Sequence, residues 1–389
     1  MRIGIDYTAA VHQGGGIGRL SRHLIRALSE LDADNDYRLF VAAGRAEDDG
    51  LGVWPANFRS CSLPLSDRWL HILWQRLRLP VPVQVITGPL DLFHSPDFVL
   101  PPTGRTPAIL TVHDLSFMRV PQFFVPGFRR YLEGAVKRAV ARARHVLADS
   151  ESTRRDLVEL LAVEAERITV VYPGVESRFQ PVREETEREW VKARYHLPDR
   201  FILGLSTLQP RKNFEGLIEA FSRLLAAQGS EPGIADLHLV IIGGKGWMYE
   251  DLLSLAERKG FGERVHFTGF VEDQDLPAIY TLAQVLAFPS WYEGFGLPVL
   301  EAMACGTPVV AANNSSLPEV VGEAGLLVDA ADVEGLASAI ARLVLDEGLR
   351  ERLIRAGFEQ ARRFRWQDAA RQLLEIYTAL GLEGKETIS

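Results

Sequence analysis

The sequence predicts an α/β protein built from two Rossmann-like, doubly wound domains. Short apolar runs typical of buried parallel strands alternate with amphipathic stretches at helical spacing, and this series occurs twice. The length of 389 residues also exceeds one ordinary hydrophobic core. Strands that alternate with helices form a parallel sheet covered on both faces. We therefore expect a first domain at 1–175 and a second at 176–364.

The first series of predicted strands is followed by a change in composition. Pro173 and Gly174 introduce a charged segment, Glu176 to Arg200, which we interpret as a partly helical interdomain region. The predicted strands before it are Arg2 to Asp6, Tyr37 to Ala42, Asp91 to His94, Ala108 to His113, His145 to Asp149 and Ile168 to Tyr172.

The second series repeats this architecture and ends before a last helix at Arg365 to Leu380. Its predicted strands are Phe201 to Ser206, Leu237 to Gly243, Arg264 to Thr268, Val285 to Phe288, Thr307 to Ala311 and Gly325 to Val328.

The composition excludes several classes of protein. Hydrophobic residues make up 47% and charged residues 24%, as in a soluble globular protein. Cys61 and Cys305 are far apart, so neither a disulfide framework nor a zinc site is expected. The start MRIGIDYTAA lacks a signal sequence, and no apolar run is long enough to span a membrane. We expect a cytoplasmic protein with no nucleic-acid partner.

A basic run in the first domain leaves open whether the protein contacts a membrane surface. Residues 119–144 contain seven Lys and Arg residues and a single Glu133. A helix of this kind is usually a solvated face, which is the interpretation that we favour. It could instead rest on anionic lipid at the inner face of a membrane.

The stretch AFPSWYEGFGLPVLEAMACGTPVV, residues 287–310, is the best guide to function. An apolar strand ends at Pro289, so the loop that follows lies at the carboxyl edge of the sheet, where α/β proteins bind ligands. Pro298 marks a helix start, whose backbone donors suit a phosphate. Glu293 and Glu301 are hydrogen-bond acceptors suited to sugar or ribose hydroxyls. Either carboxylate alone also fits an ordinary surface charge or a first helical turn.

Together these residues closely resemble the E-x7-E motif of retaining glycosyltransferases of the GT-B fold, family 4 (group 1). The resemblance covers nearly the whole chain. It implies a second domain that binds a nucleotide-sugar donor and a first domain that binds the acceptor, with the last helix, 365–389, crossing back to the first. Glu301 would hold the ribose. Glu293 and the loop Gly294, Phe295, Gly296 and Leu297 would contact the donor sugar and its phosphate.

Two loops of the first domain are further candidates. The glycine-rich loop of residues 12–18 follows the first strand and opens a helix, but its spacing is not the dinucleotide fingerprint. The resemblance places Gly15, Gly16 and Arg19 at the acceptor cleft, and a plain tight turn is the alternative. His113 ends a predicted strand, and the resemblance brings it to the donor sugar. Asp114 would orient His113 or cap the next turn.

Two adjacent cations follow the first strand of the second domain. Arg211 and Lys212 can stabilise the negative charge that appears on a leaving diphosphate without a metal ion. The surrounding Pro-Arg-Lys-Asn matches the family, although most members that we know have Glu at the position of Gln209. Gly243 and Lys245, in a glycine-rich loop that is not a P-loop, are second-tier nucleotide contacts. We reject the aspartate pairs of residues 32–36 as metal ligands, because turn chemistry explains them.

The residues and the resemblance together predict a metal-independent hexosyltransferase that needs no cofactor. The stretch VHDLSFMRVPQFF, residues 112–124, is most similar to mannosyltransferases of surface polysaccharide synthesis. GDP-mannose is therefore the first expected donor and UDP-glucose the next, with a glycan or lipid-linked acceptor. Alternatives on the same scaffold are another UDP-sugar transferase, a nucleotide-sugar epimerase, a phosphorylase and a noncatalytic sugar-binding protein. The acceptor, the linkage and the oligomeric state stay open.

Overall fold

A computed structural model describes residues 1–42, 53–63, 65, 66, 69, 71–77, 79–228, 230–246, 250–258 and 261–386. The chain forms two compact units. Unit 1 contains Met1–Met118, Phe124–Gly174 and Arg365–Ser389, and unit 2 contains Arg119–Phe123 and Val175–Phe364. The short segment Arg119–Phe123 differs from the expectation, because its contacts place it with unit 2.

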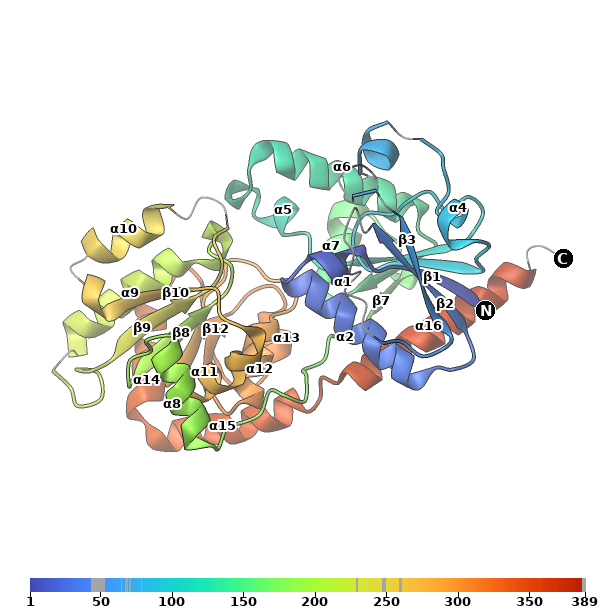
Figure 1. Ribbon diagram of the computed structural model, residues 1–389. Helices are drawn as coiled ribbons and strands as arrows, with labels where there is room; N and C mark the ends of the chain where they lie inside the picture. Colours follow the sequence, from blue (N-terminus) through green and yellow to red (C-terminus); the bar gives the residue numbers. More distant parts are fainter. Residues whose placement is uncertain are drawn as a thin grey trace. The chain divides into compact units, whose positions relative to one another are not determined.

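Unit 1 is built on a parallel sheet of the order β3-β2-β1-β4-β5-β6-β7 (Figure 1). The edge strand β3 was not predicted from the sequence, because only one of its six residues is buried and they form no apolar run. The strands are β1 (Arg2–Asp6), β2 (Asp36–Ala42), β3 (Phe58–Leu63), β4 (Leu92–Ser95), β5 (Ala108–Val112), β6 (His145–Ala148) and β7 (Ile168–Val170).

Helices cover both faces of this sheet. On one face α2 and α16 lie against each other and against apolar residues of the central strands, such as Ile5 and Leu39 (Figure 1). Helix α6 contacts β5, and α7 contacts β6 and β7. The helices are α1 (Thr8–His12), α2 (Gly16–Leu31), η1 (His71–Arg76), α4 (Gln84–Thr87), α5 (Ser116–Arg119), α6 (Pro126–Arg142), α7 (Glu151–Leu161), η3 (Ala165–Arg167) and α16 (Trp366–Glu386). The short η2 (Pro121–Phe123) belongs to unit 2.

The last helix is anchored in unit 1 by buried hydrogen bonds. The Tyr377 hydroxyl lies 2.6 Å from His94 Nδ1, and the other ring nitrogen lies 2.9 Å from Thr111 Oγ1. Gln372 Nε2 donates to the Val170 carbonyl at 2.9 Å. Burial lowers the pKa of His94 to about 3, so this imidazole is neutral at pH 7. The end of the chain therefore completes the first unit, as predicted.

Unit 2 contains a second parallel sheet, of the order β10-β9-β8-β11-β12-β13. Each predicted strand of the second series is present, with ends shifted by no more than two residues. The strands are β8 (Phe201–Leu205), β9 (His238–Ile242), β10 (Val265–Gly269), β11 (Val285–Phe288), β12 (Val309–Ala312) and β13 (Leu326–Val328).

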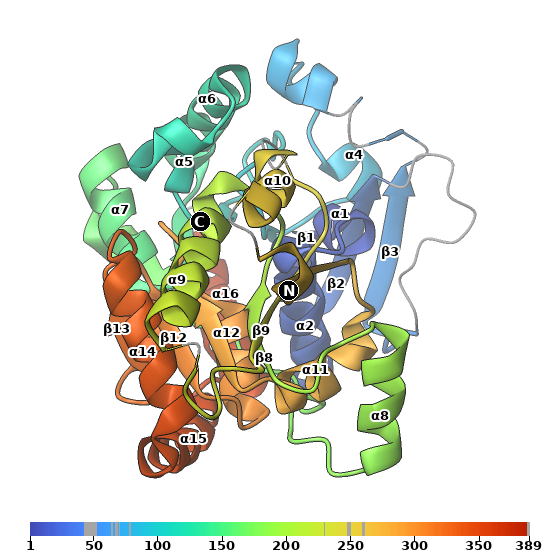
Figure 2. The same ribbon diagram turned by 90° about the vertical axis from the view of Figure 1, so that its left-hand side faces the viewer.

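Successive residues of these strands serve two different cores. Ile202 packs with α9 and α14, whereas the next residue, Leu203, packs with α11 and α12, because side chains alternate along a strand. Figure 2 shows α9 and α14 on one side of the strands and α8 and α11 on the other. The helices are α8 (Glu185–Arg194), η4 (Pro210–Lys212), α9 (Phe214–Gln228), α10 (Glu250–Arg258), η5 (Gly262–Arg264), η6 (Asp273–Asp275), α11 (Leu276–Leu282), α12 (Leu297–Ala304), α13 (Leu317–Val321), α14 (Val333–Leu345) and α15 (Glu347–Ala361).

The order of strands in unit 2 reverses between β8 and β11. From β8 the chain proceeds to β9 and β10 in one direction, and from β11 to β12 and β13 in the other. Loops that follow β8 and β11 therefore diverge at the carboxyl edge, which is where open α/β sheets bind ligands. Nowhere in the described ranges is a helix long and apolar enough to cross a membrane.

Candidate functional site

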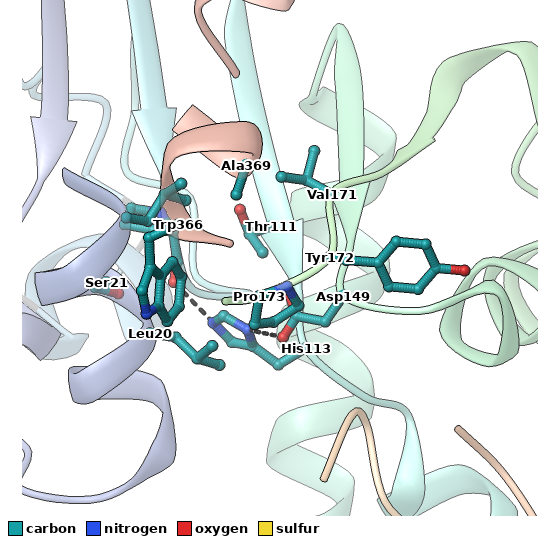
Figure 3. A pocket seen from close by; sticks show the side chains of 12 residues that line it. Leu20, Ser21, Thr111, His113, Asp149, Val171, Tyr172, Pro173, Trp366 and Ala369 are labelled. Atoms are coloured by element: carbon teal, nitrogen blue, oxygen red, sulfur yellow. Dashed lines mark hydrogen bonds and ion pairs between the residues drawn. The ribbon is translucent and has the colours of Figure 1, made fainter. Parts of the chain in front are cut away.

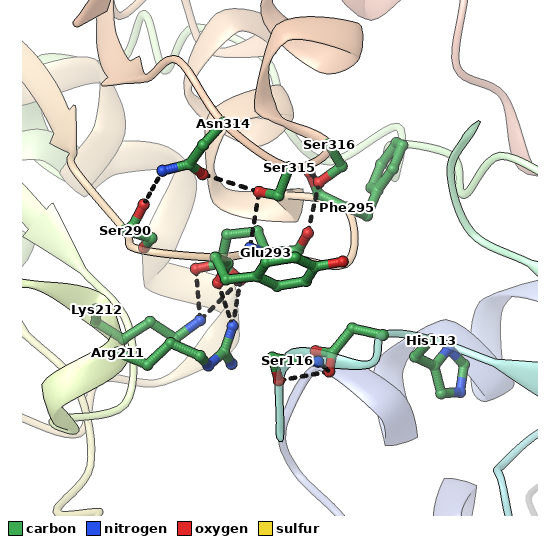
Figure 4. Close-up of polar contacts among 12 residues, drawn as sticks. His113, Ser116, Arg211, Lys212, Ser290, Glu293, Phe295, Asn314, Ser315 and Ser316 are labelled. Atoms are coloured by element: carbon green, nitrogen blue, oxygen red, sulfur yellow. Dashed lines mark hydrogen bonds and ion pairs between the residues drawn. The ribbon is translucent and has the colours of Figure 1, made fainter. Parts of the chain in front are cut away.

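Three predicted site residues meet at the point where the strand order of unit 2 reverses. Arg211 and Lys212 lie in η4, after β8, and Glu293 lies in the loop after β11. Lys212 Nζ donates to both carboxylate oxygens of Glu293, at 2.7 and 2.9 Å. Arg211 Nη1 donates to Glu293 Oε2 at 3.3 Å and to the Tyr292 carbonyl. These three side chains, shown in Figure 4, form a buried group that we call the charged cluster.

The charged cluster carries two positive charges and one negative charge. Burial alone would raise the pKa of Glu293, but the charges of Lys212 and Arg211 outweigh burial and hold it below its ordinary value. Glu293 is therefore ionised at pH 7, and the net charge of the cluster is positive. The buried Arg211 Nε has no hydrogen-bond partner among the described residues. An anion such as a phosphate would balance the positive charge of the cluster and accept a hydrogen bond from Arg211 Nε.

Three residues that the sequence analysis missed hold the Glu293 loop in place (Figure 4). They follow β12, at the same edge of the sheet. Ser315 Oγ accepts a hydrogen bond from the Glu293 amide at 2.9 Å, although Ser315 lies in the left-handed region with φ of 50°. Ser316 Oγ bonds the carbonyls of Glu293 and Phe295, and Asn314 Nδ2 donates to the Ser290 carbonyl. The sequence signal that could have identified these three residues is their position after a strand, at the carboxyl edge of the sheet.

Glu301, the second carboxylate of the motif, lies on α12 and is buried. Its Oε2 accepts a hydrogen bond from the Tyr280 hydroxyl, on α11, at 2.9 Å. The helix begins at Leu297 with Pro298 in its first turn, as predicted. Glu301 is thus one turn below the Glu293 loop, and Tyr280 fixes one side of its carboxylate.

The rest of the Glu293 loop is partly structural. The Phe295 side chain is buried in the core and packs edge-on against Phe364, at 5.6 Å between ring centroids, so a contact of Phe295 with the donor would come from its backbone. Leu297 also packs against this core. Gly296 has a φ of 117°, a conformation that side chains rarely adopt. Backbone groups of Gly294 to Gly296 stay the candidates for contact with a ligand.

The glycine loop after β9 lies against the loop after β8. A Cβ on Gly243 would lie 1.8 Å from the Ser206 carbonyl oxygen, so this glycine permits a close approach of two backbones. The Leu208 amide donates to the Gly244 carbonyl at 2.9 Å. The glycine at 243 therefore has a structural explanation, which the sequence analysis had not given. Lys245 is exposed on the same loop.

His113 of unit 1 uses both ring nitrogens within its own unit (Figure 3). Nδ1 lies 2.7 Å from Asp149 Oδ2, and Nε2 lies 2.9 Å from the Pro96 carbonyl oxygen. Both partners are acceptors, so both nitrogens donate and the ring is an imidazolium. Burial would lower the pKa of His113, but the charge and hydrogen bond of Asp149 raise it to about 9. A sugar hydroxyl would have to displace Pro96 to reach Nε2.

Asp114 does not orient His113, and Asp149 does so instead. The Asp114 carboxylate accepts hydrogen bonds from the amide and the hydroxyl of Ser116, at 2.9 and 2.5 Å. Of the two predicted roles, the structure therefore supports capping of the turn that starts α5. Asp149 ends the strand beside β5, so its position at the carboxyl edge was the signal for its role.

We expect the stability of the protein to depend on pH through His113. Its folded pKa of about 9 exceeds the ordinary value of about 6.5, so the stabilisation is complete below pH 6.5 and is lost as pH rises through 9. Asp149→Asn should lower the free energy of unfolding by roughly 2 to 3 kcal/mol at pH 6. Urea unfolding at pH 6, 8 and 10 checks this. A deficit of the same size at all three pH values would contradict it.

The glycine-rich loop of unit 1 differs from its predicted form, because α1 lies between β1 and the loop. Gly15 is the residue before α2, and Gly16 is its first residue. A Cβ on either would meet no described atom within 4 Å, so packing within the chain does not require these glycines. The Arg19 amide donates to the Gly15 carbonyl at 3.0 Å, and its side chain is half-buried. Open space beside Gly15 and Gly16 is compatible with a ligand there.

Two alanine substitutions in this loop should have opposite effects. A Cβ on Gly18 would lie 1.9 Å from the Gln13 carbonyl oxygen, so Gly18→Ala should lower the free energy of unfolding by about 2 kcal/mol. Gly16→Ala should instead raise it by up to ~1 kcal/mol through helix propensity. If a substrate approaches Gly16, this variant should also lose on the order of 10-fold in transfer rate. Thermal unfolding and a transfer assay measure both effects, and full activity of Gly16→Ala would remove the loop from the site.

In the described part of the chain, no group of three or more His, Cys, Asp or Glu side chains is gathered as a metal ion would require. The aspartates at 32–36 form a turn: Asp32 accepts hydrogen bonds from the Asp34 amide, Asn35 Nδ2 and the Tyr37 hydroxyl.

Two family descriptions match the chain, one over each half. Residues 14–179 match "Glycosyltransferase Family 4", and residues 187–360 match "Glycosyl transferases group 1". The chain belongs to this family of glycosyltransferases, in agreement with the paired sheets and the E-x7-E loop.

Individual relatives make the resemblance more specific. O-antigen chain mannosyltransferase B of Escherichia coli is 34% identical over 291 residues, which are 74% of each chain. The serotype-specific mannosyltransferase WbdA of Escherichia coli is 31% identical over 301 residues, 76% of this chain, and the match spans 36% of WbdA. Sucrose-phosphate synthase of Thermosynechococcus elongatus superposes with a TM-score of 0.76 at 22% identity, over 98% of this chain and 99% of the other. This last likeness confirms the predicted GT-B fold.

Proposed function

We propose that this glycosyltransferase transfers mannose from GDP-mannose, with retention of configuration, to a glycan or lipid-linked acceptor in surface polysaccharide synthesis. The observation that carries the proposal is the charged cluster, with its net positive charge and the unpartnered Arg211 Nε. The choice of mannose is supported by the relatives named as mannosyltransferases. UDP-glucose, another UDP-sugar and an epimerase reaction are the alternatives that the test must separate.

The roles of the residues follow from their contacts. When the bond between sugar and diphosphate breaks, negative charge develops on the leaving oxygen, and cations fixed in a buried site stabilise it. Lys212 is a compact point charge that can bind phosphate and Glu293 together, and Arg211 adds the Nε donor. Glu293 holds both cations in position and accepts hydrogen bonds from the donor sugar. Glu301 accepts hydrogen bonds from the ribose, and front-face attack guided by the leaving phosphate retains the configuration.

The proposed reaction needs neither metal ion nor cofactor, because Arg211 and Lys212 supply the charge that a metal would provide. The test is a thermal-shift and hydrolysis panel of GDP-mannose, UDP-glucose, UDP-N-acetylglucosamine and ADP-glucose, with and without EDTA. We expect a shift that is selective for GDP-mannose, survives EDTA and disappears in Glu301→Ala. A thermal shift with another nucleotide sugar would make that compound the donor in place of GDP-mannose. Loss of the shift with EDTA would overturn the metal-free mechanism. An altered sugar without acceptor would indicate an epimerase.

We also propose that α6 makes a peripheral contact with anionic lipid. Phe128, Arg130, Tyr131 and Lys137 are all exposed on this helix. Part of the basic run serves another purpose, because Arg142 donates to the carbonyls of Leu100 and Pro101, and Arg129 pairs with Glu133. Sedimentation with phosphatidylglycerol vesicles should show binding that weakens with salt and in Arg130→Glu/Lys137→Glu. No binding to these vesicles would overturn this part of the proposal.

A further inference from the structure

A cavity of about 350 Å³ lies in unit 2 next to the turn that carries Arg211 and Lys212. Gln209 and Asn213, at the two ends of this turn, line it, together with Phe214 and Glu215 of α9. Trp291, two residues before Glu293, and Ala331, after β13, also line it, and the Phe123 ring in the wall stacks on Trp291 with 5.9 Å between ring centroids. Small-molecule sites range from ~300 to 1,000 Å³, so this cavity is large enough for a small ligand.

Asn213 fixes the shape of the cavity. Its Nδ2 donates to the carbonyls of Pro289 and Ala330, at 3.0 and 2.8 Å, and its Oδ1 accepts from the Gly216 amide at 3.3 Å. One buried side chain thus joins the loops after β8, β11 and β13 and the start of α9. The walls of the cavity are therefore preorganised, and the same residue, with φ of 56°, ends the turn of the charged cluster.

Two side-chain acceptors of the cavity concern a ligand, Gln209 Oε1 and the Glu215 carboxylate. Gln209 is about nine-tenths buried, and its Oε1 has no hydrogen-bond partner among the described residues. Glu215 adds a carboxylate at the start of α9. Among the described residues that line the cavity, none carries a positive charge. A ligand that donates hydrogen bonds and carries no negative charge, such as a polyol, suits these groups, whereas a phosphate does not.

The aromatic part of the wall favours a ring-shaped polyol. Trp291 is half-buried and lines the cavity, and its amide donates to the Arg211 carbonyl at 2.9 Å, which ties it to the charged cluster. A pyranose has an apolar face of C–H groups that can lie on an indole, while its hydroxyls donate to acceptors at the edge. Trp291 provides the indole, and Gln209 provides the hydrogen-bond acceptor.

The cavity wall joins both cores of unit 2. Phe214 of α9 belongs to the core of α9 and α14, whereas Ala330 and Trp291 pack with the core of α11 and α12. Glu301, the proposed ribose ligand, is not among the described residues that line the cavity. The donor hexose is assigned to Glu293, and the acceptor is the ligand that has no assigned contact in this unit.

We propose that this cavity is an acceptor subsite of unit 2 that binds a neutral pyranose of the glycan being extended. The inference rests on the proposed transferase function and adds a contact of the acceptor with the unit that binds the donor. Trp291 stacks on the sugar ring, and Gln209 Oε1 accepts a hydrogen bond from one hydroxyl. Neither residue takes part in bond breaking.

Binding of a neutral oligosaccharide without donor tests the subsite directly. We would measure saturation-transfer NMR and isothermal titration with α-linked mannotriose, with maltotriose as a second probe. Ala331→Trp fills the cavity from an exposed position, and Ala227→Trp, at the exposed far end of α9, is the matched control. We expect mannotriose binding to be lost in Ala331→Trp and kept in Ala227→Trp. Gln209→Leu should weaken it by about 5-fold to 10-fold.

Donor binding and hydrolysis, measured on the same variants, separate this inference from the proposed function. If wild type binds GDP-mannose but neither trisaccharide, the subsite is wrong and the transferase function stands. If wild type binds no nucleotide sugar, the proposed function fails first. Equal loss of donor hydrolysis and saccharide binding in Ala331→Trp would assign the cavity to the donor hexose and overturn the proposal. Saccharide binding that survives in both Ala331→Trp and Gln209→Leu would place the glycan elsewhere.

Discussion

Lys212→Met should reduce kcat/KM for sugar transfer by about 10²-fold to 10³-fold, which is the cost of removing one charge-stabilising group from a buried site. Lys212 makes the two short contacts to Glu293, at 2.7 and 2.9 Å, whereas Arg211 makes one at 3.3 Å. The variant therefore leaves Glu293 poorly compensated, and the free energy of unfolding should fall by roughly 3 kcal/mol. Steady-state kinetics and urea unfolding measure the two effects.

A double variant separates the loss of catalysis from the loss of stability. Lys212→Met/Glu293→Gln removes one charge of each sign, so no buried carboxylate is left uncompensated. We expect most of the stability to return while transfer stays low, because the cation that faces the leaving diphosphate is still missing. Recovery of transfer in the double variant would show that Lys212 serves only to neutralise Glu293.

The fold could be predicted from the sequence because both sheets are parallel and buried. Strands such as β5 and β11 are fully buried and almost entirely apolar, and the pattern of strand and helix repeats in the second half. The elements that the sequence did not predict share one physical cause. The edge strand β3 (Phe58–Leu63) buries only one of its six residues, and α1 (Thr8–His12) is only five residues long, so neither has a periodic apolar pattern.

The candidate site could be predicted residue by residue, but the partners within it could not. Arg211 and Glu293 are 82 residues apart, and their contact depends on β8 and β11 being neighbours in the sheet. The same holds for His113 and Asp149, which directly follow the neighbouring strands β5 and β6. Motif spacing identifies such residues one at a time, whereas strand order decides which of them meet. Ser315 and Ser316 were missed because serines in a turn carry no chemical signal of their own.

Strand order also gives Gly243 a structural explanation that the sequence analysis did not have. Gly243 is a candidate nucleotide contact through the resemblance to the family, and the structure adds that the backbone of Ser206 approaches it closely. Gly15 and Gly16 differ, because a Cβ there meets no described atom within 4 Å. A glycine that the chain itself does not require is the stronger indication of a ligand.

Glu301→Gln should raise the dissociation constant of the donor nucleotide by about 10-fold to 100-fold and leave kcat little changed. A hydrogen bond to a charged acceptor contributes about 1.5 to 3 kcal/mol, and the ribose hydroxyls do not change during transfer, so the loss is uniform binding. The glutamine keeps the shape of the side chain and can still accept from the Tyr280 hydroxyl, which now bonds Glu301 at 2.9 Å. Isothermal titration with the nucleoside diphosphate measures the change.

A 2′,3′-dideoxy nucleotide turns this prediction into a test of contact between Glu301 and the ribose. Wild type should bind the dideoxy form more weakly than the ribonucleotide, whereas Glu301→Gln should lose little further affinity, since the same hydrogen bonds are removed by either change. Tyr280→Phe is the matched control, because it removes the hydroxyl that bonds Glu301 and keeps the carboxylate; it should respond to the dideoxy nucleotide as wild type does. If the dideoxy nucleotide loses as much affinity for Glu301→Gln as it does for wild type, the ribose binds elsewhere and Glu301 serves as the buried partner of Tyr280.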